Sequence, residues 1–152
     1  NPVETDINVL AVDLLDSNTL IVTASRYLFA FDINPAAVSP IMLGYAELPE
    51  YAFQTVVTGS RAYVADGSGG LRLYDLSGVR SGSSITLLGS LEVYGEVIHV
   101  AVQNAGTAIL GTILTGTATL LLIRYGWSKA MPLSASWQCF RPSASPISWK
   151  NV

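Results

Sequence analysis

The sequence AFQTVVTGSRAYVADGSGGLRLYDLS, at residues 52–77, decides how the rest of the chain is interpreted. Three short segments, 53–58, 61–65 and 70–76, are rich in valine, tyrosine and leucine, which strands favour. Glycine-containing turns separate these segments. Glycine suits such turns, since it takes positive φ angles without steric cost. The second of these turns contains Asp66, Gly67 and Gly69 and leads into Gly70, the first residue of the third segment. The stretch therefore predicts consecutive strands joined by tight hairpins.

The same pattern returns at a spacing of 43 to 45 residues. Residues 43–48 (LGYAEL) are echoed by 88–93 (LGSLEV), and 27–33 (YLFAFDI) by 70–76 (GLRLYDL). A degenerate third copy is TLLLIRY at 119–125. This period is typical of four-stranded β-propeller blades. We therefore predict an all-β fold, a propeller-like array of about three four-stranded antiparallel blades that is incomplete or closed by oligomerisation.

The repeat divides the chain into a repeat domain at 1–126 and a tail at 127–152. The three units cover about 9–52, 53–97 and 98–137, the last including its outer strand. The tail follows the repeat poorly and is rich in tryptophan and proline. Its aromatic residues are the candidate buried material of a cap or an interface. They are Trp127, Trp137, Phe140 and Trp149.

Composition excludes several classes of protein. The chain is 50% hydrophobic and 12% charged, about half the charge of a typical soluble domain, which excludes a disordered chain. A net charge of −3 argues against nucleic-acid binding. One cysteine excludes an internal disulfide framework and a cysteine-based zinc cluster, and one histidine argues against a histidine-rich metal site. We expect no cofactor.

The charges are divided unevenly along the chain. Residues 1–96 hold all eleven acidic residues and four basic ones, a net charge of −7, whereas 97–152 hold the other four basic residues, a net charge of +4. One interpretation is a basic end that binds a partner, and the favoured one is a last third that is simply poor in charge.

The apolar segment 107–123 approaches the roughly 20 residues of a membrane helix. The repeat instead requires a hairpin at 114–117, so we predict strands there.

Residues 56–66 (VVTGSRAYVAD) and 70–77 (GLRLYDLS) resemble the LVIVD-type repeat of bacterial and archaeal β-propeller proteins. The resemblance covers about residues 9–125 and is strongest in the middle unit. It implies a part of a large exported or surface-attached protein, and brings no catalytic residues with it. We accordingly expect an extracellular, periplasmic or cell-surface location.

Several polar residues have both a functional and a structural interpretation. The loop that begins at Asp66 resembles a calcium loop, but lacks the further acidic oxygens, so a hairpin is favoured. Asp32 and Asp75 follow strands, where a carboxylate accepts hydrogen bonds from turn amides. We interpret His99 as a packing histidine rather than a general base, and Cys139 as an inert buried thiol.

Three blades leave two apolar end faces uncovered. The chain is then part of a longer propeller, is capped by its own tail, or pairs with a second copy. We expect a homodimer whose interface is formed by the first unit and the tail around Trp137 and Trp149.

The leading function is a non-enzymatic binding and assembly module that acts through protein–protein contacts. A carbohydrate-binding module is the alternative, with candidate aromatic residues Tyr27, Tyr45, Tyr51, Tyr63 and Tyr94. A fragment of a larger propeller enzyme is a third.

Overall fold

The computed structural model describes residues 8–36, 38–93, 95–104, 107–114, 117–125 and 135–140, and side chains are described only up to residue 102. These residues form three four-stranded sheets, each built from four consecutive antiparallel strands. The first sheet contains β1 (Val9–Asp16), β2 (Thr19–Ala24), β3 (Tyr27–Asp32) and β4 (Ile41–Glu47). The second contains β5 (Gln54–Thr58), β6 (Arg61–Ala65), β7 (Leu71–Asp75) and β8 (Thr86–Leu91), with the 3₁₀ turn η1 (Val79–Ser81) before β8. The third contains β9 (Glu96–Asn104), β10 (Thr107–Leu114), β11 (Thr117–Tyr125) and β12 (Ala135–Phe140).

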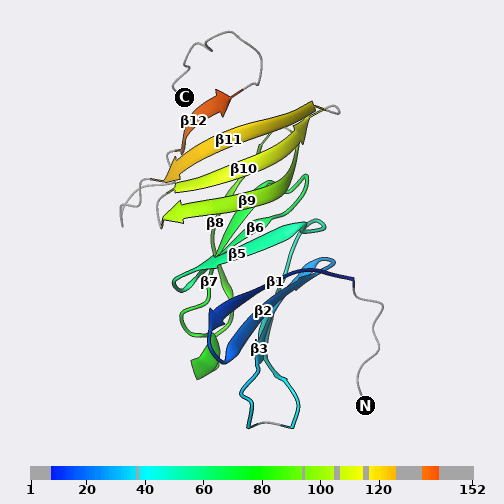
Figure 1. Ribbon diagram of the computed structural model, residues 1–152, viewed down its shortest axis with the longest axis vertical. Helices are drawn as coiled ribbons and strands as arrows, with labels where there is room; N and C mark the ends of the chain where they lie inside the picture. Colours follow the sequence, from blue (N-terminus) through cyan, green and yellow to red (C-terminus); the bar gives the residue numbers. More distant parts are fainter. Residues whose placement is uncertain are drawn as a thin grey trace.

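The sheets follow one another along the long axis of the molecule (Figure 1). The first strands of the sheets, β1, β5 and β9, are neighbours, so the sheets meet along their inner edges. The predicted all-β array of three four-stranded antiparallel sheets is confirmed. Residues 107–123, a segment long and apolar enough to suggest a membrane helix, instead contribute to strands β10 and β11. Within the described part of the chain, no helix is long and apolar enough to cross a membrane.

Strands β6 and β7 of the middle sheet are largely buried, and their side chains alternate between its two faces. Ala62 and Val64 of β6 belong to the apolar core shared with the first sheet. Tyr63 and Ala65 of the same strand belong to a second core, shared with Val97 and others of the third sheet. A strand covered on both faces is apolar at successive positions, as β6 is. The second sheet therefore holds the array together.

The hairpin between β6 and β7 requires glycine for two different reasons. Gly67 and Gly70 have φ angles of 52° and 80°, in the left-handed region that favours glycine. A Cβ atom on Gly70 would also overlap the carbonyl oxygen of Leu91 on β8. The loop is further joined to β9, since Gly67 and Val97 exchange backbone hydrogen bonds of 3.1 and 2.9 Å. The hairpin thus connects the second sheet with the third.

Replacing Gly70 with alanine should destabilise the protein by more than about 2 kcal/mol, because backbone strain and the overlap with Leu91 add together. Gly59→Ala is the matched control, since Gly59 has a similar φ of 59° but open space around its Cβ position. It should cost only about 1 kcal/mol. Urea unfolding measures both. Equal costs would show that the approach of Leu91 contributes nothing.

Candidate interaction surface

The first sheet has one apolar face that no other sheet among the described residues covers. Cross-strand partners lie on the same face of a sheet, so the registers of β1 to β4 define which side chains share it. We call this surface the open face. It consists of Val12 and Leu14 of β1, Leu20 and Val22 of β2, Tyr27, Phe29 and Phe31 of β3, and Met42 and Tyr45 of β4.

The edges of the open face are accessible to solvent. Val12 and Leu14 are 59% and 53% exposed, and Met42 and Tyr45 are 53% and 57% exposed. The opposite face of the same sheet is different, because Leu28 and Ala30 are fully buried against the second sheet. At its centre the open face is less accessible, since Val22 is buried and Phe29 and Phe31 are half-buried. An apolar surface that is exposed along its edges is a candidate interaction site.

Aromatic rings form the centre of the open face. Phe29 lies 5.6 Å from Tyr27, 6.0 Å from Phe31 and 6.2 Å from Tyr45, measured between ring centroids. Such distances suit favourable offset and edge-on contacts. The rings therefore restrain one another in the free chain, which would lower the entropy lost if a ligand bound to this face.

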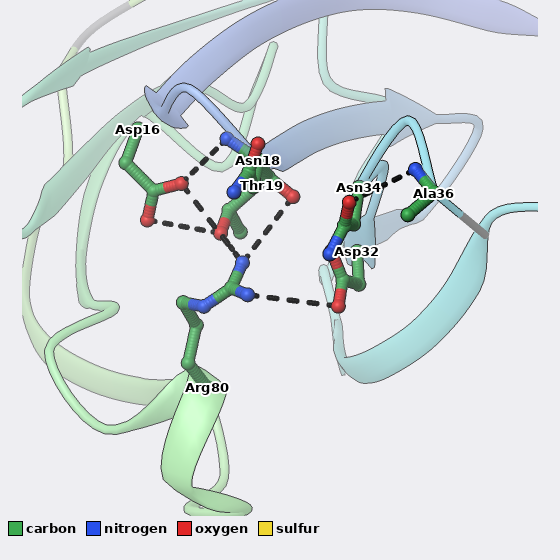
Figure 2. A network of polar contacts seen from close by, with 7 residues as sticks. All are labelled: Asp16, Asn18, Thr19, Asp32, Asn34, Ala36 and Arg80. Atoms are coloured by element: carbon green, nitrogen blue, oxygen red, sulfur yellow. Dashed lines mark hydrogen bonds and ion pairs between the residues drawn. The ribbon is translucent and has the colours of Figure 1, made fainter.

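Arg80 of η1 joins the second sheet to the first (Figure 2). Its guanidinium donates hydrogen bonds to the Thr19 hydroxyl at 2.6 Å and to the Asn18 carbonyl at 3.3 Å. It also lies 3.6 Å from an oxygen of Asp32 and 3.9 Å from an oxygen of Asp16. The hydrogen bond from the Asn18 amide, followed by those from Thr19 and the charge of Arg80, lowers the pKa of Asp16. We call this network the Arg80 clasp.

The inner strands are joined by side-chain hydrogen bonds to the backbone of the next sheet. The Val57 amide of β5 donates to Asp13 of β1 at 2.7 Å. The Val100 amide of β9 donates to Gln54 of β5 at 2.9 Å. The hydroxyls of Thr23 on β2 and Thr55 on β5 also form a hydrogen bond between the first two sheets. Each junction thus combines an apolar core with a polar contact at the inner edge.

Asp66 is fully buried and pairs with Arg72, whose Nε lies 2.6 Å from Oδ2. Burial raises the pKa of Asp66, against the opposing effects of the hydrogen bond and charge of Arg72. Its Oδ1 has no hydrogen-bond partner among the described residues. A search of these same residues finds no group of three or more His, Cys, Asp or Glu side chains that could hold a metal ion. The pair with Arg72 connects the hairpin loop to β7.

The other polar candidates lie apart from one another. The Asn34 amide donates to Asp32 at 3.0 Å, and the Ser77 amide donates to Asp75 at 2.9 Å. His99 is exposed on β9, with Nδ1 3.3 Å from the amide oxygen of Gln54. The structure does not bring these side chains together into a reactive site.

The tail and the tyrosines are described only in part. Trp137, Cys139 and Phe140 lie in β12, in register with Ile123, Leu121 and Leu120 of β11, and their side chains are outside the described set. The described residues do not include Trp127, Trp149 and Tyr94.

The other candidate sugar-stacking residues differ in exposure. Tyr63 is buried, Tyr27 is half-buried, and Tyr45 and Tyr51 are exposed. Only Tyr27 and Tyr45 belong to the open face.

Comparison with solved structures identifies the architecture. Sqt1 of Saccharomyces cerevisiae superposes with a TM-score of 0.64 at 14% identity, over 81% of this chain and 33% of Sqt1. The chain has the fold of β-propeller blades. It spans about a third of the length of Sqt1, a propeller protein of the WD40 type. The computationally designed protein Ika4 superposes with a TM-score of 0.58 at 11% identity, over 89% of this chain and 94% of Ika4.

Comparisons of sequence give no further assignment. No family model matches the chain, and no curated protein matches it. The fold is therefore shown by the structural likeness, and the LVIVD resemblance of the middle unit is not supported by a family match.

Replacing Arg80 with methionine should cost about 1 kcal/mol near pH 7, a modest value because Arg80 is 41% exposed and water screens its charge. The pKa of Asp16 is lower in the folded state than its usual 3.8, so its contribution is complete above that value and is lost as the pH falls through the folded pKa. The cost of the substitution should therefore shrink near pH 2.

Arg26→Met is the matched control, because Arg26 donates to the carbonyl of Leu48, a group that does not titrate. Urea unfolding of the wild type and both variants at the two pH values measures the difference. A pH-independent cost for Arg80→Met would show that the carboxylates of the clasp contribute nothing.

Proposed function

We propose that this chain is a non-enzymatic binding and assembly module that acts through protein–protein contacts made by the open face. The single observation behind the proposal is that this face, continuous over four strands, is apolar at its centre and exposed at its edges. The β-propeller fold supports it, since stacked blades normally cover each other's faces. The open face lacks that cover in the described chain.

The chemistry of the face favours a protein over a carbohydrate. A sugar site needs polar groups placed around an aromatic ring to bond the hydroxyls of the ligand. Around the ring of Phe29, the neighbours on the open face are Val22, Tyr27, Phe31 and Tyr45. Aliphatic and aromatic side chains in that arrangement match the desolvated centre of a protein interface.

The finer parts of the proposal rest on sequence. The LVIVD-like motif of the middle unit supports membership of that repeat family and an exported or surface-attached location. The tail residues Trp137 and Trp149 are proposed to add to the interface, because large aromatic side chains dominate interface energetics.

A photo-crosslinking amino acid placed at Tyr45 tests the proposed function in cells that make the chain. We expect protein adducts at Tyr45 several-fold above those of the same probe at Leu87, a residue of β8 that is 46% exposed but lies outside the open face. A glycan array probed with the wild type provides the second arm. Glycan binding that Tyr45→Ala abolishes, without protein adducts at Tyr45, would replace the proposal with the carbohydrate alternative.

A further inference from the structure

We propose that the open face is covered by a second copy of this chain, whose third sheet stacks on it, so that two chains close one ring of six blades. This inference rests on the proposed function and names its partner. Two chains with three sheets each give a ring within the range of roughly four to eight blades that propellers use.

The repeat shows what kind of surface fits the open face. Register places Leu20 of β2 opposite Phe31 of β3, as it places Ala62 of β6 opposite Tyr74 of β7. Ala62 and Tyr74 are buried in the core between the first and second sheets. Leu20 and Phe31 therefore hold the positions that, one repeat later, pack on a preceding blade. The natural cover of the open face is the corresponding face of another blade.

The third sheet offers such a face at the other end of the array. Val100 of β9 is buried against the second sheet and Val102 packs against the same core, whereas Ala101 between them is exposed. Successive residues of a strand alternate between faces, so Ala101 marks the uncovered side of the sheet. The next two strands, β10 and β11, hold leucine or isoleucine in both of their alternating sets, and no charge occurs from 97 to 123. Strands of that kind are typical of sheets covered on both faces.

Charge favours pairing head to tail over pairing of two open faces. Residues 9–48, which form the first sheet, hold four acidic residues and one basic residue. Residues 96–152, which include the third sheet, hold four basic residues and one acidic residue, Glu96. Opposite net charges attract and like charges repel across an interface. The first sheet therefore suits the third sheet of a second copy better than it suits itself.

Two-fold closure makes both junctions form together. Once the first sheet of one chain meets the third sheet of its partner, the second junction is intramolecular and forms at a high effective concentration. A closed ring leaves no apolar end face, so association stops at two chains.

Analytical ultracentrifugation of the full chain tests this inference. The 16.1 kDa chain should sediment as a dimer at micromolar concentration. Val12→Glu on the open face and Ala101→Glu on the third sheet both replace exposed residues, so both should fold, and each should weaken dimerisation by at least about 100-fold. Leu87→Glu, the control outside both faces, should leave the dimer intact. Circular dichroism verifies that each variant is folded.

The two variants separate the modes of assembly. In the ring, each substitution damages both junctions of its own homodimer. In a mixed dimer of the two variants, the unchanged open face of one chain meets the unchanged third sheet of the other. An equimolar mixture should therefore regain one intact junction. A dimer that Val12→Glu breaks and Ala101→Glu does not would overturn the ring in favour of two open faces. A ladder of larger oligomers would overturn closure.

A wild-type chain that stays monomeric at every concentration would overturn the second copy as occupant. Protein adducts at Tyr45 would in that case still support the proposed function with a different partner. Absence of both would overturn the two together.

Discussion

The middle sheet of this array packs against a sheet on each side, and the alternation of side chains along β6 makes this possible. Ala62 and Val64 pack toward the first sheet, while Tyr63 and Ala65 pack toward the third. Each of the two cores thus receives one alanine and one larger side chain from the same strand. Loss of packing in either core would expose a face of the middle sheet, so the stability of each junction depends on the other.

Polar contacts fix the orientation of one sheet relative to the next. Apolar packing alone does this poorly, because the hydrophobic effect is not directional. The inner edges are aligned by hydrogen bonds from Val57 to Asp13 and from Val100 to Gln54. At the end of the β1–β2 turn, the Arg80 clasp restrains the first two sheets at a second place (Figure 2). Contacts at two separated places prevent one sheet from rotating over the other. The open face is therefore presented by a rigid sheet.

The fold could be predicted because its signals are local, while much of the interaction surface could not. The repeat and the glycine-rich turn before Gly70 indicated where strands end. In β3, however, both alternating sets are apolar, and only the register shows that Phe29 faces outward while Leu28 is buried. The Arg80 clasp was not foreseen, since 61 positions separate Arg80 from Thr19 and a single arginine in a loop gives no signal. The prediction that the first unit forms an interface came only from the argument that three blades leave two end faces uncovered.

Each sheet consists of four strands that are consecutive in sequence, and this has a consequence for synthesis on the ribosome. Local pairing lets a sheet form as soon as its last strand emerges. At about 5–20 residues per second, the roughly 45 residues of the next sheet take about 2 to 9 seconds to follow. During that interval the nascent first sheet exposes both of its faces. The arrival of β6 covers Leu28 and Ala30, but no later strand of the described chain covers Phe29 and Phe31, so this apolar surface stays exposed longest and is where a chaperone would bind the nascent chain.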